Sequence, residues 1–347
     1  MAKTIFLRLS GWAALLSLVS LGALAAQDQA NRQPVSGPVL GFVADRLSGV
    51  RPILGIPGAA TLGSPVLSKS GFRSIVFSRD YALAAAAGGG PVVLLRNLQS
   101  TVSAVEIQAP AGAGRMALSP SGDAAVLYYP QTQSVAVLTG LPQSPAVSWN
   151  LEAQSLAGAL AALAVSDGGG AVLIATAGEP SSVWLLAPDG GSRFLSYVTA
   201  APSLAFLAGN HDVLIADGTL STVALVRDAA GQAQLTQIGG PAEGVSHPVA
   251  VAAGKGRVLV ANAEPAGIVS LSLEGEPPLA VPCQCRVTGL EPLADGATFR
   301  LSDPGAGPIW LLDAAGSPPR IVFVPDDSRV RPAPHRLPLP ARQGGVR

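Results

Sequence analysis

The chain has 347 residues and no net formal charge, and only 13% of its residues are charged against 48% that are hydrophobic. The body of the chain carries no basic patch, so we expect no nucleic-acid partner. Mean hydropathy is high at +0.41, yet beyond residue 25 no apolar run approaches the ~20 residues that a membrane-spanning helix needs. We therefore expect no transmembrane segment in the mature protein.

The first 25 residues have the pattern of a secretory signal. Lys3 and Arg8 precede an apolar run at residues 12–24, and the small residues Ala23, Ala25 and Ala26 lead into a polar segment. Because this order of charged start, apolar centre and small-residue cleavage site directs export, we expect residues 1–25 to be removed and the mature protein to be secreted or periplasmic. Residues 26–38 are polar, contain Pro34 and Gly37, and are typical of a linker.

From residue 39 to residue 325 a unit of about 43 residues recurs, each with several short apolar strands. The first-strand runs lie at residues 75–78, 116–119, 163–166, 204–207, 249–252 and 290–293. The third-strand runs lie 17 to 20 residues later, at 92–95, 135–138, 183–186, 223–226, 268–271 and 309–312. A single small sheet cannot bury both its faces alone, so this repeat predicts the blades of an all-β propeller. We expect the third-strand Trp184 and Trp310 to be packed between blades.

Six repeats are complete, and a seventh precedes them. One period before residue 75, strands are expected at 39–44 and 50–56, but no first strand is found. We therefore predict a seven-bladed propeller with an incomplete N-terminal blade, completed, if at all, by the region after Val324. The alternative is six blades plus a hairpin. Residues 326–347 are rich in Pro and Arg and predict a disordered tail, or else a tether to an acidic surface.

Parts of the repeat resemble NHL or YVTN-type propeller repeats. His-Pro-Val-Ala-Val at 247–251, Arg-Val-Leu-Val-Ala-Asn at 257–262 and Ile-Val-Ser-Leu at 268–271 follow that order, with a Pro opening the first strand and Ala-Asn closing the second. The resemblance covers about residues 39–324. It implies an exported bacterial propeller, a scaffold that serves lactonases, phytases, lyases and binding proteins alike.

Polar residues that could carry chemistry fall at two kinds of position in the repeat. Asp80, Asp123, Asp167 and Asp295 follow first strands, where tight turns favour Asp and Gly, so we assign them to turns. A second set lies in the loops after second strands or before first strands, which share one face of a propeller. Its members are Arg115, Tyr129, Glu179, Asp217, Glu243, His247, Asn262, Glu264 and Asp303.

This second set is our candidate ligand-binding face. Asp217, Asn262 and Asp303 occupy aligned positions in three neighbouring blades, and side-chain oxygens of this kind suit Ca²⁺ or Mg²⁺. Lactonase-like propellers use such a site, as the resemblance implies. The aligned positions in other repeats are Thr176, Tyr129 and Gly88, which offer no carboxylate or amide oxygen. We therefore expect no resident cofactor, with Ca²⁺ or Mg²⁺ as the alternative.

No catalytic motif stands out. His247 directly follows Ser246, and neighbours in sequence rarely form a nucleophile and base pair, because that arrangement depends on geometry. We thus assign no catalytic residue and predict a monomeric, non-catalytic binding or structural module whose ligand, a protein or a small molecule, is not indicated. A metal-dependent, lactonase-like hydrolase that uses carboxylates around the channel is the alternative.

Cys283 and Cys285 are the two cysteines of the chain. In an exported protein such a pair favours a disulfide over free thiols. Two extended residues this close in sequence place their Cα atoms ~6.5 Å apart, which is long for a disulfide, so the bond requires strain or a local kink in the outer strand.

Overall fold

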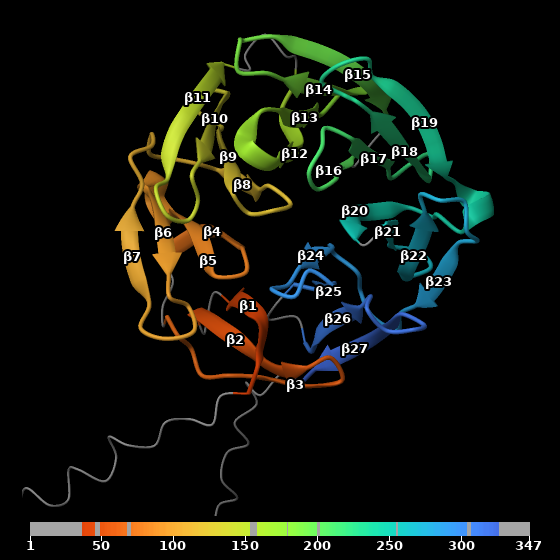
Figure 1. Ribbon diagram of the computed structural model, residues 1–347, viewed down its shortest axis with the longest axis horizontal. Coiled ribbons are helices and arrows are strands. Elements are labelled where there is room, and N and C mark those ends of the chain that lie inside the picture. The colour runs from red at the N-terminus through yellow and green to blue at the C-terminus, as the bar shows by residue number, and fades with distance from the viewer. Residues whose placement is uncertain are drawn as a thin grey trace, which may run out of the picture. The chain divides into compact units, whose positions relative to one another are not determined.

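The computed structural model describes residues 37–45, 49–67, 71–152, 158–178, 180–199, 202–254, 256–303 and 307–325. The predicted signal, nearly all of the predicted linker and the predicted tail therefore lie outside the described residues. The described chain forms seven antiparallel sheets arranged around a common axis (Figure 1). This confirms the prediction of an all-β propeller with seven blades, which we number 1 to 7 in chain order.

Blade 1 has three strands, β1 (Val39–Asp45), β2 (Gly49–Ile56) and β3 (Ala59–Leu62). The four-stranded blades 2 to 4 consist of β4 (Phe72–Phe77), β5 (Tyr81–Ala86), β6 (Val92–Arg96), β7 (Ser103–Glu106), β8 (Arg115–Leu118), β9 (Ala124–Tyr129), β10 (Ser134–Thr139), β11 (Ala146–Glu152), β12 (Leu160–Val165), β13 (Val172–Thr176), β14 (Ser181–Leu186) and β15 (Ser192–Val198). Blades 5 to 7 consist of β16 (Ser203–Phe206), β17 (Val213–Asp217), β18 (Thr222–Arg227), β19 (Gln234–Gly239), β20 (Pro248–Gly254), β21 (Arg257–Asn262), β22 (Gly267–Ser272), β23 (Leu279–Pro282), β24 (Glu291–Pro292), β25 (Thr298–Arg300), β26 (Ile309–Asp313) and β27 (Arg320–Val324).

Three short 3-10 turns complete the secondary structure of the described ranges, at Ala87–Gly89, Asp167–Gly169 and Pro241–Glu243. No helix among these residues is long and apolar enough to cross a membrane.

Burial changes from the inner to the outer strand of each blade. The second strands β13 and β17 are buried at every residue, whereas the outer strand β7 is exposed at every residue and β11 alternates between exposed and half-buried positions. Strands that are covered on both faces are continuously apolar, whereas strands at the rim need apolar side chains on one face at most. This is why the outer strands are faint in the sequence.

The hydrophobic core is divided among the interfaces between blades. Leu83 and Leu94 of blade 2, for example, share one buried cluster with Leu127 and Leu138 of blade 3. Trp184 packs against the core between blades 3 and 4 and Trp310 against the core between blades 6 and 7, as expected, but both rings are only half-buried. Each lies beside a phenylalanine of the exposed outer strand, with ring centroids 5.5 Å apart for Trp184 and Phe194 and 5.6 Å apart for Trp310 and Phe323.

Blade 1 lacks an innermost strand within the described residues, as predicted, and blade 7 covers the edge that this leaves. The Ala294 N–H donates to the Leu40 carbonyl over 2.9 Å. Leu293 packs so closely on Gly41 that a Cβ atom there would lie 2.9 Å from its Cδ2. Two buried clusters, one shared with blade 7 and one with blade 2, complete the closure. The described sheets of blades 1 and 7 therefore pack on each other, and the region after residue 325, which was expected to complete blade 1, lies outside the described residues.

Candidate functional site

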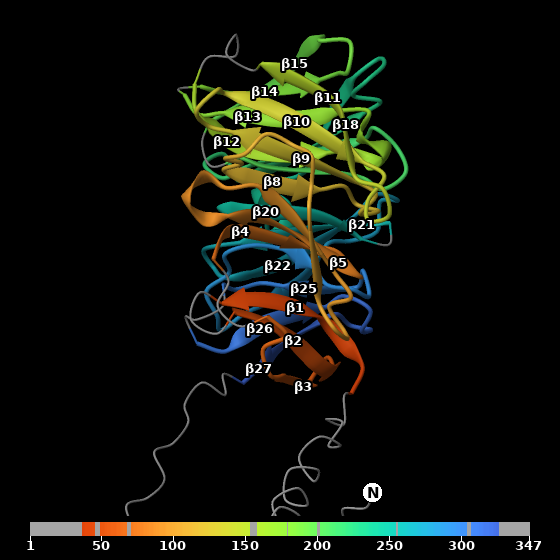
Figure 2. The ribbon, with the colours of Figure 1, turned by 90° about the vertical axis from the view of Figure 1, so that its left-hand side faces the viewer.

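The connections between strands gather at two faces of the ring. Inner strands such as β8 and β12 run across its thickness (Figure 2), and successive strands are antiparallel. The loops after second strands and the connections into first strands therefore share one face, which we call the loop face. The turns after first and third strands share the opposite face, which we call the turn face. The candidate ligand-binding residues that the structure describes lie in the segments at this loop face. Glu179 lies outside the described residues.

Asp217, the last residue of β17, is buried and organises the loops of blade 5. Its Oδ1 accepts hydrogen bonds from the N–H groups of Thr219 (3.0 Å) and Leu220 (2.9 Å) and from the Thr199 hydroxyl (2.5 Å). Its Oδ2 accepts the Thr199 N–H over 2.6 Å. Burial by itself would raise the pKa of Asp217, but these hydrogen bonds outweigh it and hold the pKa below the ordinary value.

Asn262 does the same work in blade 6, at the end of β21. Its side-chain oxygen accepts the Ser246 N–H over 3.1 Å, and its side-chain NH₂ donates to the Gly244 carbonyl over 2.8 Å. It is also buried. Asp217 thus fastens the incoming connection of blade 5 to the loop after its second strand, and Asn262 fastens the incoming connection of blade 6 to the end of β21.

Asp303 does not share this role. It is largely exposed and lies 3.8 Å from the Arg300 guanidinium, which also pairs with Glu291. Asp217, Asn262 and Asp303, which are aligned in the repeat, therefore have separate partners. The side chains of Asp217 and Asn262 already bond to main-chain groups. Within the ranges that the structure describes, no group of three or more His, Cys, Asp or Glu side chains could hold a metal ion.

His247 and Ser246 are adjacent on the loop face, and their shorter hydrogen bonds go to other residues. The Ser246 hydroxyl donates to the Glu264 carbonyl over 2.6 Å, while its oxygen lies 3.3 Å from the His247 Nδ1. The His247 N–H donates to the Ser221 hydroxyl of blade 5, and the residue takes a left-handed φ of 43°. The backbone of this connection is tied down, whereas the side chains of His247 and Glu264 are exposed.

Two other predicted residues, Arg115 and Glu243, make structural hydrogen bonds. The exposed Arg115 donates from a guanidinium nitrogen to the Ala161 carbonyl of the next blade over 2.5 Å. The Glu243 carboxylate accepts the Gly240 N–H over 2.8 Å and so caps the 3-10 turn before β20.

Tyr129, the last residue of β9, corrects an expectation. Its ring is only 5% exposed and belongs to the core between blades 2 and 3, so it does not face a ligand. Burial raises the pKa of Tyr129 to about 12. Its hydroxyl has no hydrogen-bond partner among the described residues.

The turn face contains a set of hydrogen bonds between blades that the sequence did not reveal. Asp167 accepts the Ser121 N–H of blade 3 and the Gly209 N–H of blade 5, each over 2.8 Å. Asp123 accepts the Gly168 N–H of blade 4 over 3.0 Å. These are turn residues, as predicted, but each carboxylate also joins neighbouring blades. The turns lie one repeat apart in the sequence, which is the signal that could have identified the neighbours.

Cys283 and Cys285 are joined by a disulfide, and their Cα atoms are 5.1 Å apart. They follow the outer strand β23, which ends at Pro282, so the chain is bent where the bond forms. This is the kink that the close spacing required. The pair lies on the connection into blade 7, and both side chains pack against the core between blades 6 and 7.

No protein-family model and no curated protein sequence matches this chain. Among solved structures, it is similar to a catalytically inactive variant of virginiamycin B lyase from Staphylococcus aureus, solved with quinupristin. That match has 11% identity and a TM-score of 0.49, and covers 80% of this chain and 92% of the lyase chain. A chain of a nidogen–laminin complex has 12% identity and a TM-score of 0.45, with 68% of this chain and 89% of that one covered. A protein of unknown function from Desulfotomaculum acetoxidans has 15% identity and a TM-score of 0.45, with 69% and 74% covered. Likenesses of this size carry neither an activity nor a ligand over to this chain.

Proposed function

We propose that this protein is an exported, non-catalytic β-propeller that binds a partner through its loop face. The observation that carries the proposal is the use of Asp217 and Asn262, the two best-placed candidates for chemistry, as fasteners of main-chain groups. A carboxylate that already accepts four hydrogen bonds has little capacity left for a metal ion or a substrate. The same bonds hold the loops in one conformation, and a pre-organised surface binds with less loss of entropy.

Exposed charged and polar side chains stand on the loop face, and two of them, His247 and Glu264, lie next to the bonds that Asn262 and Ser246 make. Arg115 lies on the side of blade 3, and His247, Glu264 and Asp303 lie on the side of blades 6 and 7. This distribution places a cationic group across the ring from anionic ones. It favours a partner with complementary charges over a purely apolar ligand. Export, for which the first 25 residues supply the support, is part of the same proposal.

Site-specific photo-crosslinking in the producing cells tests the binding face. Glu264 and Glu274 are both exposed residues of blade 6, but Glu264 is on the loop face and Glu274 follows a third strand on the turn face. A photoreactive amino acid at position 264 should give a discrete adduct, and the same group at position 274 should give none. Adducts from position 274 alone would contradict the proposal.

An activity assay tests the absence of catalysis. Purified protein with added Ca²⁺ or Mg²⁺ should not hydrolyse lactones or phosphate esters above the rate given by buffer and metal alone. Metal-dependent turnover that disappears in Asp217→Asn would instead favour a hydrolase.

A further inference from the structure

A small cavity opens between blades 6 and 7 at the turn face, away from the loop face. Its volume is about 140 Å³. Blade 6 contributes Arg257, Leu259 and Ser270 to its wall, and blade 7 contributes Ala297, Phe299 and Ala314. One cationic side chain therefore borders a space that is otherwise mostly apolar.

At two other interfaces an arginine reaches across to the next blade. Arg96 of blade 2 donates to the Pro142 carbonyl of blade 3 over 2.5 Å and to the Gln143 carbonyl over 2.9 Å. Arg193 of blade 4 donates to the Ala229 carbonyl of blade 5 over 3.2 Å. In both cases the guanidinium spans the gap between blades near the turn face.

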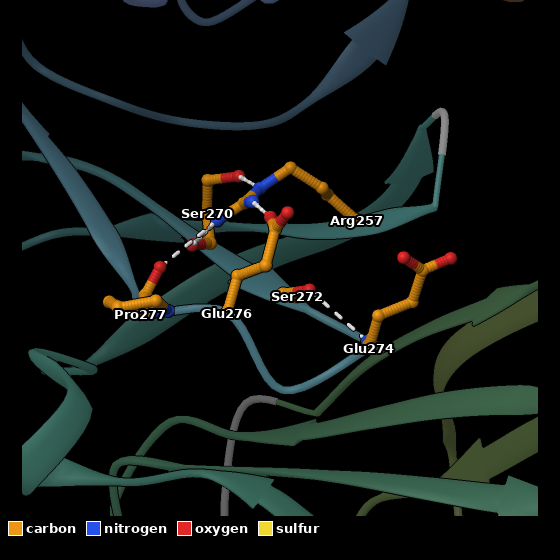
Figure 3. Close-up of polar contacts among 6 residues, drawn as sticks. All are labelled: Arg257, Ser270, Ser272, Glu274, Glu276 and Pro277. Carbon is orange, nitrogen blue, oxygen red and sulfur yellow. Dashed lines mark hydrogen bonds and ion pairs between the residues drawn. The ribbon is translucent and has the colours of Figure 1, made fainter.

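Arg257 turns back onto its own blade instead (Figure 3). Its Nε donates to the Ser270 hydroxyl over 2.7 Å, and one terminal nitrogen donates to the Ser270 carbonyl over 3.0 Å and to the Pro277 carbonyl over 3.3 Å. The other terminal nitrogen pairs with the Glu276 carboxylate at 2.5 Å. The guanidinium is thus fixed in place, and the space toward blade 7 stays open.

The ion pair between Arg257 and Glu276 is the contact of the guanidinium that a ligand can most easily replace. Glu276 is 62% exposed, whereas Arg257 is only 22% exposed. An ion pair with one partner in water contributes little, so an anion that also fills the apolar part of the cavity can compete with Glu276. In Figure 3 no contact joins the carboxylate of Glu274, two residues earlier, to Arg257, and the Glu274 N–H donates to the Ser272 hydroxyl over 3.1 Å.

The residues that line the cavity indicate the chemical class of its ligand. A guanidinium prefers the planar carboxylate group, and the Phe299 ring and the alanines prefer an apolar body. A cavity of roughly 150 Å³ takes a molecule the size of benzene, so the body can have about six non-hydrogen atoms in all. We propose that this cavity binds a short-chain aliphatic monocarboxylate, with Arg257 holding the carboxylate in place of Glu276. Phosphate and sulfate match the charge but leave the apolar wall without a partner.

Calorimetric titration of the purified protein with butyrate tests the proposal. Saturable binding to one site is expected for butyrate. 1-Butanol, which lacks the charge, and phosphate, which lacks the apolar body, should both bind more weakly than butyrate. Equal binding of phosphate and butyrate, or no saturable binding of butyrate, would overturn the proposal.

Four variants locate the site. Glu276→Gln removes the competing carboxylate and should tighten butyrate binding about threefold, while the matched Glu274→Gln should leave it unchanged. Arg257→Gln should weaken binding by about tenfold or more. Arg257 also supports its own blade, so a second variant that keeps the guanidinium is needed. Ala314→Leu fills the cavity and should abolish butyrate binding. Unchanged affinity in Glu276→Gln together with unchanged affinity in Ala314→Leu would exclude this cavity as the site.

Discussion

The two faces of the propeller use the same kinds of side chain in different ways. On the loop face, the buried Asp217 fastens loops within one blade, and the Tyr129 hydroxyl is buried without a partner among the described residues. On the turn face, the less buried Asp167 joins three blades, and the buried Tyr81 hydroxyl donates to the Gly122 carbonyl of the next blade over 2.5 Å. Among these four residues, the two on the turn face join neighbouring blades and Asp217 stabilises a single blade, while elsewhere on the loop face Arg115 and the His247 N–H also reach a neighbouring blade.

The largest effect is expected for Asp217→Ala. The substitution leaves the N–H groups of Thr199, Thr219 and Leu220 without their acceptor, and the free energy of unfolding should fall by roughly 3 kcal/mol. Urea denaturation measures it. Asp217→Asn keeps one side-chain oxygen and should lose clearly less, so equal losses in the two variants would show that the four hydrogen bonds do not fasten the loops.

The same carboxylate should make the protein sensitive to acid. The folded-state pKa of Asp217 is lowered, since its hydrogen bonds outweigh the opposing effect of burial. Its contribution is thus complete above the unfolded value of about 3.9 and is lost as the pH falls through the lower folded value. The stability difference between wild type and Asp217→Ala should be constant from neutral pH down to that region and then shrink. A difference that grows on acidification would have the wrong sign for this account.

The tyrosines offer a matched pair within one buried cluster. Tyr81→Phe removes a buried hydrogen bond and should cost about 1 kcal/mol, whereas Tyr129→Phe removes a hydroxyl with no partner and should be neutral or stabilising by up to ~1 kcal/mol. Thermal unfolding of the two variants measures the contrast. A cost for Tyr129→Phe as large as that for Tyr81→Phe would mean that its hydroxyl is hydrogen-bonded in solution, for example to a buried water molecule.

Asp167→Ala should have a smaller effect than Asp217→Ala although it cuts bonds to two blades. The Ser121 and Gly209 N–H groups lie near the surface, where water can replace the carboxylate, so the expected cost is about 1 kcal/mol. The same urea titration measures it. A loss equal to that of Asp217→Ala would show that contacts between blades, and not the loops, limit the stability of the ring.

The sequence predicts the inner strands better than it predicts the site. Strands β5 and β13 are continuously apolar because both faces are covered, and they lie between the first- and third-strand runs that the repeat gives. The four-residue β3 was missed, because a short, mostly exposed strand leaves little pattern. Asp217 and Asn262 stood out by their aligned positions in the repeat, but the bonds that fasten the incoming connections come from residues 18 and 16 positions away in sequence, and no local pattern gives the shape of those connections. The cavity between blades 6 and 7 depends on the Arg257 side chain bonding to its own blade, and the sequence does not indicate that direction.

The smallest effect is expected for the disulfide, which is the covalent counterpart of the loop-face fasteners. Asp217 and Asn262 fasten the connections into blades 5 and 6, and Cys283 and Cys285 bridge the connection into blade 7. A bond between residues two apart closes a very small loop and restricts the unfolded chain little, so replacing both by Ser should barely shift the melting temperature. Thiol titration of denatured, unreduced protein from an oxidising compartment should find no free cysteine, and reduction should be easier than for a disulfide that closes a long loop. Two free thiols per chain would leave blade 7 with non-covalent contacts alone, and a large drop in melting temperature would mean that this connection depends on the bond far more than its spacing implies.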